Sequence, residues 1–432
     1  MLSTSPLPRR LLGACLAASA ALLLWTVPPA QAQPKEIVYS TFLDPANARD
    51  PRAAAQTKMI AAFEKANPDI KIKLLVDPTV QIVARALKSH DATPDVLRTT
   101  GYSVAEMSAT GAMLPLDDLI ARDKLSTTDW LLPLDRNRIA GHLYSLPQDY
   151  RIPILMYRKS LLAQAHVTPP RTWDELCATG PHFTERGIIP FALPVGATGG
   201  LGGAQGLGEF YLSSMLPGDD GGYFKADGTI AFSRDSFIRA AKTIKDLFTT
   251  CKTTPMQSLQ LGINEVHDGL RAGKIAMSDF GLFRFRTIQD QGAGDDLGWA
   301  PAPAYTADGR ETVYGYQIAL NTFSKNHEEG WRFLRFMISP EAEAIAAEGG
   351  EVVSRASAYD AAYFKSPQAS NQKQWAELIH ARGREVQYTP ILTAFHQIVG
   401  DAIQRMVLSN ATPESAYDEV VKLYDAALAK SR

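Results

Sequence analysis

The sequence contains few cysteines and no run of basic residues. Only three cysteines occur in 432 residues, none are spaced as C-x-x-C, and no H-E-x-x-H motif or histidine cluster is present. A metal site therefore has little support, and no cofactor is expected. Lysine plus arginine (44) nearly equals aspartate plus glutamate (46), which gives a net charge of −2. Without a basic patch, nucleic acid is not expected as a partner.

Motifs of common enzyme classes are also missing. Neither a G-x-S-x-G nucleophile turn nor a G-x-x-x-x-G-K-[ST] phosphate loop occurs. The glycine-rich stretch 194–208 contains only a fragment of G-x-G-x-x-G. We interpret it as a loop at the edge of a cleft, with Gln205 and Glu209 as secondary candidates for ligand contact. The sequence therefore gives no support to a serine hydrolase of this type or to a phosphate-binding loop.

Only the N-terminal segment contains a long apolar run. Arg9 and Arg10 precede apolar residues 11–27, and Ala30-Gln31-Ala32 fits a small-x-small cleavage site. This pattern predicts a secretory signal peptide over residues 1–32, exported by the general or the twin-arginine route; the alternative is a membrane anchor. Cleavage would leave a soluble periplasmic protein of about 400 residues that begins at Gln33.

Two cysteines, Cys177 and Cys251, remain in that mature chain. In an exported protein they either form one disulfide or stay as two unrelated buried thiols, and the sequence leaves both possibilities open. A disulfide would close a long loop and so restrict the unfolded chain.

Strand and helix patterns alternate along the mature chain. The pattern predicts strands at residues 35–42 and 70–76, separated by a helix over residues 53–65. Such alternation predicts mostly parallel α/β sheets, and a chain of this length suits two lobes rather than one core. Helical spacing also predicts core packing, rather than a ligand-binding box, for Trp331, Phe333 and Phe336.

The chain is organised around residues 141–162, GHLYSLPQDYRIPILMYRKSLL. A short strand ends near Pro147, which has no N–H to donate, and polar or aromatic residues 148–151 follow. The apolar run from Ile152 to Tyr157 then predicts a strand buried on both faces. We interpret this stretch as the chain leaving one lobe for another. Residues at such a crossing line the cleft between lobes, where ligands tend to bind.

This stretch, with PPRTWDEL at residues 169–176, resembles a segment of the ABC-importer extracellular solute-binding proteins of family 1, the maltose-binding-protein-like receptors. Further similarities follow in order: FEKANPDIKIKLLVD from Phe63, GAMLPLDDL from Gly111, GKIAMSDFG from Gly273 and TVYGYQIAL from Thr312. Phe280-Gly281 stands where the family usually has Gly-Pro, so the shape of the second crossing is left open.

The resemblance implies a periplasmic-binding-protein type II fold, in which two α/β lobes are joined by hinge crossings with the ligand cleft between them. It assigns residues 33–147 with 280–326 to the first lobe and residues 148–279 with 327–432 to the second. It also implies a monomeric receptor without a cofactor. Such a receptor binds a small solute, here a mono- or oligosaccharide, and delivers it to the transmembrane permease subunits of an ABC importer.

A sugar is held by aromatic faces that stack on its C–H groups and by polar side chains that bond its hydroxyls. Strand ends and crossings bring such residues to a cleft. The candidates are Phe42, Asp44, Tyr102, Gln148, Asp149, Tyr150, Arg151, Asp279, Phe280, Tyr314, Tyr316 and Arg355. We expect Tyr316 or Phe42 to stack on a neutral saccharide, and Arg151 and Asp279 to bond its hydroxyls.

Two alternatives remain open. A secreted glycan hydrolase would need two facing carboxylates, for which Asp149 and Asp279 are the candidates. A receptor of the same fold for a polyamine, a peptide or a metal chelate would show the same pattern, because a fold does not determine its ligand.

Overall fold

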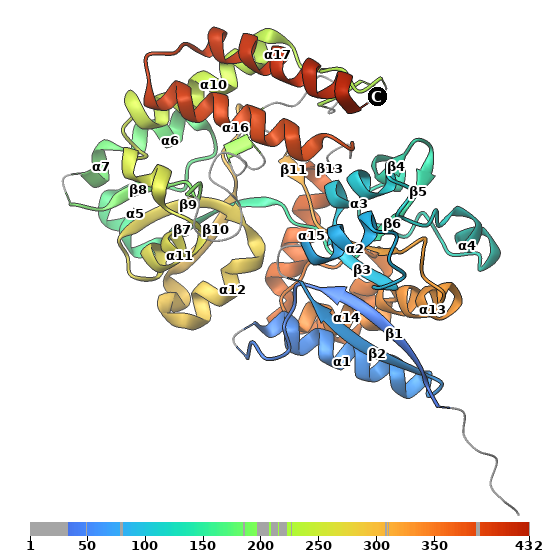
Figure 1. Cartoon of the computed structure of the whole chain (residues 1–432). Helices are drawn as coiled ribbons and strands as arrows, with labels where there is room; N and C mark the ends of the chain where they lie inside the picture. Colours follow the sequence, from blue (N-terminus) through green and yellow to red (C-terminus); the bar gives the residue numbers. More distant parts are fainter. Residues whose placement is uncertain are drawn as a thin grey trace, which may run out of the picture.

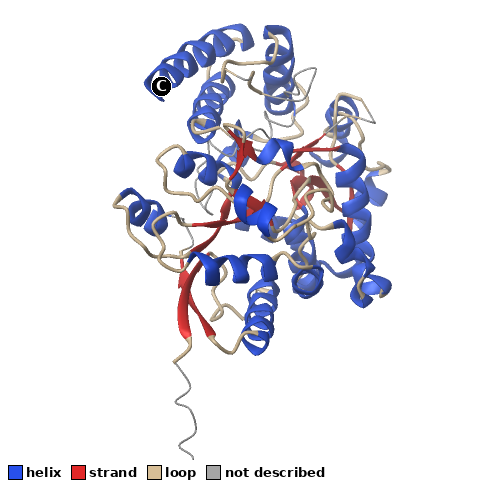
Figure 2. Ribbon diagram, turned by 90° about the vertical axis from the view of Figure 1, so that its right-hand side faces the viewer, coloured by secondary structure: helices blue, strands red, loops and turns tan. Residues whose placement is uncertain are grey.

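The computed structural model describes residues 33–48, 50–77, 81–184, 186–196, 207–208, 215, 223–225, 227–306, 309, 311–385 and 389–431. The predicted signal peptide and the candidates Gln205 and Glu209 lie outside these residues. Within the described part of the chain, no helix is long and apolar enough to cross a membrane. The described residues form two lobes, each built from strands with helices around them (Figures 1 and 2).

The first lobe contains a five-stranded sheet with the order β2-β1-β3-β12-β6. Its strands are β1 (Lys35–Thr41), β2 (Ile70–Val76), β3 (Val96–Thr100), β6 (Ser145–Pro147) and β12 (Tyr316–Leu320). Strand β1 pairs in parallel with β2 and β3, as expected for strands joined by helices, whereas β12 runs antiparallel between β3 and β6. A strand from the second half of the chain therefore lies inside this sheet.

Helices surround this sheet and complete its core. They are α1 (Pro51–Ala66), α2 (Gln81–Lys88), α3 (Gly101–Ser108), α4 (Asp117–Arg122), α13 (His327–Met337) and α14 (Pro340–Glu348). Asp50 caps α1 by accepting a backbone N–H of its first turn, and the helix then places Phe63 with its ring centroid 5.0 Å from that of Phe333. Trp331 and Phe333 are fully buried and Phe336 packs against the same core, which confirms the core prediction for these three residues.

The second lobe contains a four-stranded sheet with the order β10-β7-β9-β8. Its strands are β7 (Pro153–Arg158), β8 (Ile189–Ala192), β9 (Ile275–Gly281) and β10 (Leu297–Pro301). Strand β9 pairs antiparallel with β7 and parallel with β8, so this sheet is mixed. Ile154, Leu155 and Met156 are fully buried, which confirms that the apolar run after the crossing is a strand covered on both faces.

Helices of this lobe, and those beside it, come from three parts of the chain. They are α5 (Lys159–Ala165), α6 (Trp173–Thr179), α7 (Pro181–Thr184), α10 (Arg234–Thr249), α11 (Ile263–Arg271), α12 (Phe285–Ile288), α15 (Ser370–Arg382), α16 (Leu392–Leu408) and α17 (Pro413–Ser431). The C-terminal helices α16 and α17 lie against α10 at the top of Figure 1.

Two pairs of short strands lie outside the two main sheets. They are β4 (Arg138–Ile139) with β5 (His142–Leu143), and β11 (Glu311–Val313) with β13 (Gly383–Glu385).

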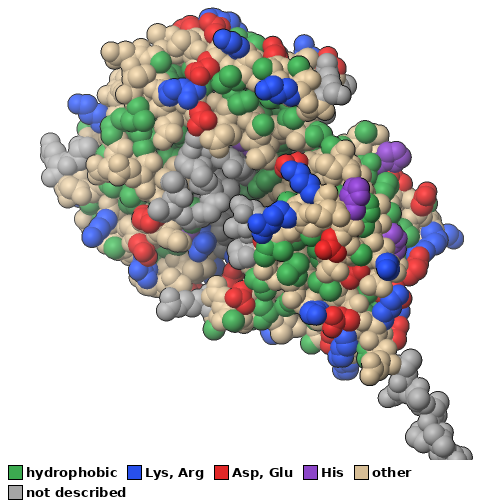
Figure 3. Space-filling model, viewed as in Figure 1, with side chains coloured by type: hydrophobic (Ala, Val, Ile, Leu, Met, Phe, Trp, Pro, Cys, Tyr) green, Lys and Arg blue, Asp and Glu red, His purple; other side chains and the backbone are tan. Residues whose placement is uncertain are grey.

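The surface carries charges of both signs. On the face shown in Figure 3, basic side chains (blue) and acidic side chains (red) are interspersed rather than gathered into one large patch. This distribution agrees with the nearly balanced charge of the sequence.

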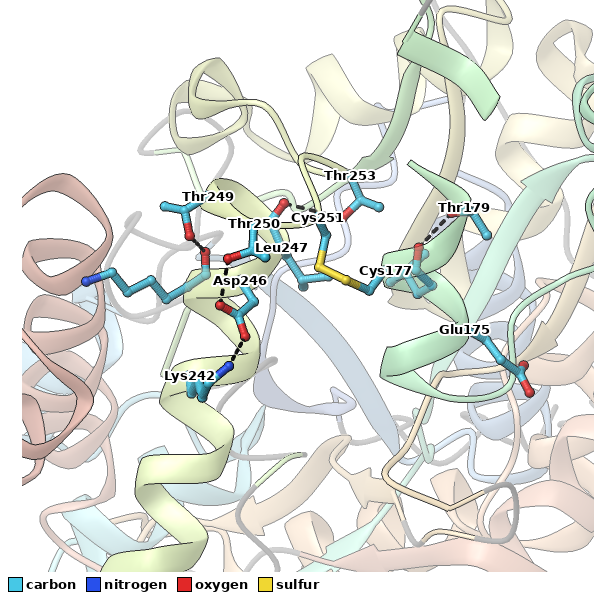
Figure 4. The surroundings of a disulfide bond; sticks show 12 residues. Glu175, Cys177, Thr179, Lys242, Asp246, Leu247, Thr249, Thr250, Cys251 and Thr253 are labelled. Atoms are coloured by element: carbon cyan, nitrogen blue, oxygen red, sulfur yellow. Dashed lines mark hydrogen bonds and ion pairs between the residues drawn. A yellow bond between two sulfur atoms is a disulfide. The ribbon is translucent and has the colours of Figure 1, made fainter. Parts of the chain in front are cut away.

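Cys177 and Cys251 form a disulfide, which decides between the two possibilities that the sequence left open. The bond joins α6 to the turn that follows α10 (Figure 4). Asp246 supports this turn, because its backbone carbonyl accepts the N–H of Cys251 at 2.8 Å and its carboxylate accepts the hydroxyl of Thr250 at 3.0 Å. The disulfide thus ties two helices of the second lobe together at their ends.

The two sheets divide the chain differently from the sequence-based division. Residues 280–326 were assigned to the first lobe, yet Leu297–Pro301 pairs with β7 in the second. Residues 327–432 were assigned to the second lobe, yet α13 and α14 pack on strands and helices of the first. The reason is that the chain continues in the second sheet beyond β9 and returns to the first only at β12.

Candidate ligand-binding site

The predicted crossing after Pro147 lies beside two other segments of the chain. Asp149 forms an isolated antiparallel bridge with Val353, and Arg151 forms one with Tyr314. Between them, the N–H of Tyr150 donates to the carbonyl of Val352 at 2.9 Å. The outgoing crossing is therefore held between the returning chain at 314–316 and the loop at 351–353.

A buried network of charged side chains supports this junction. Nη2 of Arg98, on β3, lies 2.7 Å from Oδ2 of Asp149 and 2.5 Å from Oε1 of Glu351. Nε of Arg151 lies 3.1 Å from Oδ1 of Asp149, and the N–H of Tyr316 donates to the same oxygen at 3.2 Å. Each of the four charged side chains is less than 9% exposed. We call Arg98, Asp149, Arg151 and Glu351 the crossing network.

Burial and neighbouring charges change the pKa values of the two carboxyls of the crossing network in opposite directions, lowering that of Asp149 and raising that of Glu351. Burial raises the pKa of Asp149, but Arg151 and Arg98 outweigh this effect and hold the pKa below its usual value. For Glu351 burial is the larger effect, so its pKa is raised although Arg98 opposes the rise. Asp149 is therefore the firmly ionised partner of the two arginines.

The two aromatic residues predicted to stack on a sugar lie against each other. The rings of Phe42 and Tyr316 stack with their centroids 4.3 Å apart. The guanidinium of Arg151 lies 4.6 Å from the Tyr316 centroid, and that of Arg98 lies 5.2 Å from each ring. Cation–π attraction accounts for this arrangement. These rings thus contact the crossing network.

A cavity of about 540 Å³ opens next to this junction. Its lining residues come from the segment around the start of α1 and the end of α14 in the first lobe, and from α11, α12 and the residues around α12 in the second. They are Asn47, Asp50, Pro51, Arg52, Asn264, His267, Asp268, Arg271, Arg284, Arg286, Thr287, Ile288, Gln291 and Gly349. Both lobes therefore contribute to the cavity, and none of its described lining residues is phenylalanine, tyrosine or tryptophan.

Arg52 connects the cavity to the crossing network. Its guanidinium lies 5.4 Å from the Phe42 centroid and binds Asp50 through two contacts, Nε to Oδ1 at 2.9 Å and Nη2 to Oδ2 at 2.6 Å. Burial raises the pKa of Asp50, but the bonds from Arg52 outweigh it and keep the pKa low. The fork-to-fork pair fixes one wall of the cavity at the start of α1.

The opposite wall carries Arg284 and His267. Burial lowers the pKa of Arg284, and the positive charges of Arg52 and Arg151 lower it further, while Asp50 opposes them. Burial and the charge of Arg284 together lower the pKa of His267 to about 3. His267 is therefore a neutral imidazole at physiological pH.

Some of the predicted site residues meet at the junction, while others belong to the cores. Phe42, Asp149, Arg151 and Tyr316 lie together as described above, and the N–H of Gln148 donates to the carbonyl of Tyr316 at 2.9 Å. Three other aromatic candidates pack in hydrophobic cores. Tyr150 is fully buried, whereas Tyr102 and Tyr314 are partly buried. None of the twelve candidates is among the described residues that line the cavity.

Three further candidates are placed elsewhere, and the side chain of a fourth is not described. Asp44 is exposed and accepts the N–H of Ala46 at 2.8 Å. The guanidinium of Arg355 lies 2.8 Å from Asp129 and 4.9 Å from the Trp130 ring, so it holds a loop of the first lobe. Asp279 is buried in β9, where burial raises its pKa to about 8. The side chain of Phe280 lies outside the described residues.

The sequence reasoning missed the polar residues of the cavity. Asp50-Pro51 is a typical start of a helix, and this pattern would have placed Arg52 in the first turn of that helix. Arg284 lies within Leu282-Phe283-Arg284-Phe285, where a charged side chain among apolar residues signals a local partner. Nothing local, however, indicates that these two segments face each other.

The comparisons with known proteins agree with this architecture. The family model described as bacterial extracellular solute-binding protein matches residues 46–344. The chain belongs to this family. A probable amino-acid ABC transporter periplasmic-binding protein of Sinorhizobium fredii is 23% identical over 294 residues, 66% of this chain and 64% of that one. A mannitol-binding protein of Pseudomonas aeruginosa is 27% identical over 327 residues, 71% of this chain and 72% of that one.

The aligned part of this family member spans less than two thirds of the length of each of the first three curated relatives. Solved structures match over more of the chain. The GacH receptor of Streptomyces glaucescens, described unliganded and with acarbose, gives a TM-score of 0.76 at 21% identity, over 92% of this chain and 99% of that one. Maltose-bound MalE3 of T. maritima gives 0.74 at 18% identity, over 91% and 99%. These matches confirm the periplasmic-binding-protein type II fold.

Proposed function

We propose that the protein is the extracytoplasmic solute-binding receptor of an ABC importer and binds a sugar or a polyol between its lobes. The observation that carries the proposal is the polar cavity of about 540 Å³ to which both lobes contribute. Its size lies within the usual range for small-molecule sites, about 300–1,000 Å³. Membership of the solute-binding family supports the receptor role.

The cavity lining suits a ligand rich in hydroxyl groups. A hydroxyl both donates and accepts, and the walls offer the carboxylate of Asp50, the amides of Asn47 and Asn264, and guanidinium donors. Because no phenylalanine, tyrosine or tryptophan is among its described lining, hydrogen bonding rather than ring stacking would orient the solute. The names of related proteins mention mannitol, maltose and acarbose, which supports this ligand class.

Binding would favour closure of the lobes. A solute that touches Arg52 from the first lobe and Asn264 from the second gains both sets of contacts only when the lobes are close together. The crossing network joins the outgoing crossing at residues 149–151 to the returning chain at 314–316 and to the loop at 351–353. We expect the lobes to rotate as units about the crossings for this reason. The closed form would then be recognised by the permease subunits of the importer.

The test is a thermal-shift screen of the mature protein against sugars, polyols and amino acids, followed by calorimetry. A solute at 100 times its Kd should stabilise the protein by about 2.7 kcal/mol and raise Tm by a few degrees. Stabilisation by amino acids but not by sugars or polyols would overturn the proposed ligand class. Incubation with glycans should release no new reducing ends; their release would support the hydrolase alternative instead.

A further inference from the structure

Glu343 is a buried carboxyl that lies beside the crossing but outside the crossing network. It belongs to the first turn of α14 and is 1% exposed. Its side chain contacts the loop at 351–355, and the same loop holds the outgoing crossing through Val352 and Val353. Any change in the state of Glu343 therefore acts one contact away from the junction of the lobes.

A chain of hydrogen bonds joins Glu343 to the start of the crossing. Oγ of Ser354 lies 2.6 Å from Oε1 of Glu343 and 2.7 Å from the carbonyl oxygen of Pro147, at the end of β6. The backbone N–H of Arg355 donates to the other carboxyl oxygen, Oε2, at 2.8 Å. Ser354 is fully buried, so bulk water does not compete for these contacts.

The number of hydrogens in this chain points to a protonated carboxyl. A serine hydroxyl has one hydrogen to donate, whereas a carbonyl and an ionised carboxylate can only accept. Contacts of 2.6 and 2.7 Å on one oxygen each need a hydrogen of their own. Both are satisfied when Glu343 carries a proton on Oε1 and donates it to Ser354, while Ser354 donates its own hydrogen to Pro147.

The surroundings of Glu343 favour this protonated form. Burial raises its pKa to about 8, although the bonds from Ser354 and Arg355 and the positive charge of Arg355 oppose the rise. The other charged or titratable groups that face it are Tyr359, in the short helix Ala356–Asp360, and three side chains that line a small cavity together with it: Arg52, Arg98 and Glu351.

The arginines among these neighbours are bound to other carboxylates. Arg355 lies 2.8 Å from Asp129, and Arg52 binds both oxygens of Asp50. Arg98 bridges the two carboxylates of the crossing network. The hydrogen-bonded partners of Glu343 are thus the neutral groups of Ser354 and of the Arg355 backbone.

We propose that a proton on Glu343 controls how firmly the crossing is held. While the carboxyl is protonated, it and Ser354 tie α14 and the loop at 351–355 to the end of β6. When the proton passes to solvent, Ser354 turns its single hydrogen to the charged carboxylate, which is the stronger acceptor, and its bond to Pro147 is lost. The lobes then rotate more easily about the crossing. This property does not depend on which solute the receptor binds.

The direction of the pH effect follows from the two states of the loop. When the loop opens, Glu343 meets water and its pKa returns to the ordinary value of 4.5, whereas in the closed loop the pKa is raised to about 8. The closed loop is therefore favoured most at low pH, and this preference is lost as the pH rises through about 8. Between the two values, each pH unit should increase the open fraction about tenfold for this one group.

Hydrogen exchange of the unliganded mature protein tests the proposal. The amide of Tyr150 donates to the carbonyl of Val352, so it exchanges when the loop opens. In Glu343→Gln, the amide nitrogen replaces the protonated oxygen and donates to Ser354 at every pH. After correction for intrinsic exchange, the ratio of opening in wild type to that in Glu343→Gln should rise about tenfold per unit from about pH 5.5 to 7.5. Glu351, whose pKa burial also raises, affects both proteins alike.

Two further variants and a spectrum complete the test. Glu341→Gln is the control, because Glu341 is exposed on the same helix, and it should follow the wild type at every pH. Ser354→Ala removes the link to Pro147 and should increase opening already at about pH 5.5. The infrared difference between wild type and Glu343→Gln should contain the C=O band of a protonated carboxyl at about pH 6, which disappears with a midpoint near the raised pKa. Circular dichroism shows that each variant is folded.

The outcomes decide the proposal without reference to a solute. Absence of the protonated band at about pH 6 would overturn it, and so would a ratio of opening that stays constant with pH while the band is present. Opening in Ser354→Ala equal to that of the wild type at about pH 5.5 would also refute the link through Ser354. The thermal-shift screen tests the ligand separately, so either idea can fail while the other stands.

Discussion

Removing Arg98 should destabilise the protein strongly, because this side chain bridges two buried carboxylates. It lies 2.7 Å from Asp149 and 2.5 Å from Glu351, and all three side chains are at most 5% exposed. In Arg98→Met the side chain keeps a similar length but loses its charge. Of the cations that act on Glu351, Arg151, whose Nη2 is 3.9 Å away, and Arg52 would then remain.

The expected cost is about 3–5 kcal/mol of unfolding free energy, the usual penalty for breaking a buried ion pair from one side. Arg405→Met is the matched control: Arg405 pairs with Glu419 at 2.5 Å, but both side chains are exposed, so the cost should be about 1 kcal/mol or less. Urea denaturation at pH 7, followed by circular dichroism, measures both values.

The pH dependence gives an independent check. The pKa of Glu351 is already raised by burial, and loss of Arg98 removes the effect that opposes the rise. A raised folded-state pKa means that stability is greatest while the carboxyl is protonated and is lost as the pH rises through that pKa. The deficit of Arg98→Met should therefore shrink as the pH falls below neutral. A deficit equal to that of Arg405→Met, or one independent of pH, would refute the structural role assigned to the crossing network.

Three further predictions concern the disulfide, a buried acid and the arginine that pairs with Asp129. Cys251→Ser should cost about 4 kcal/mol by the chain-entropy model, since the bond to Cys177 spans 74 residues, and thiol titration of the denatured, unreduced wild type should find no free thiol in the mature chain. The pKa of Asp279 is raised to about 8 by burial, so its contribution to stability is lost as the pH rises from about 4 to about 8. Asp279→Asn should reduce the decline in Tm between pH 5 and 9, to which Glu343, whose pKa burial also raises to about 8, still contributes. An unchanged profile would contradict the assignment. Arg355→Ala should cost about 1–3 kcal/mol by breaking the pair with Asp129, yet leave solute affinity unchanged; a weaker affinity would return it to the ligand site.

Local patterns were sufficient for the parts of the fold that depend on near neighbours. The period of 3.6 residues placed Trp331 and Phe333 in a core, because each helix must bury one face. The break at Pro147, followed by polar residues and an apolar run, located a crossing between lobes, because proline cannot continue a strand ladder. These signals lie within a few residues of one another, and the family resemblance added the two-lobed plan.

Contacts between distant segments were decided only by the tertiary structure. The second crossing was expected near Phe280, but β9 pairs with β7 in the second sheet, and the chain returns to the first sheet only at β12. No local sequence pattern indicates which strand a given segment will pair with. The structure also pairs Arg151, a predicted ligand residue, with Asp149 in the crossing network.

The candidate site shows the same division between sequence and structure. Arg98 meets Asp149 across 51 residues and Glu351 across 253, and the cavity joins the start of α1 to α11 and α12. The sequence alone determined the first strands and helix, the core position of Trp331 and Phe333 and the crossing after Pro147, because periodicity and turn chemistry act over a few residues. The tertiary structure decided which charges meet and which walls face each other, because burial of the two sheets, rather than any local preference, brings those segments together.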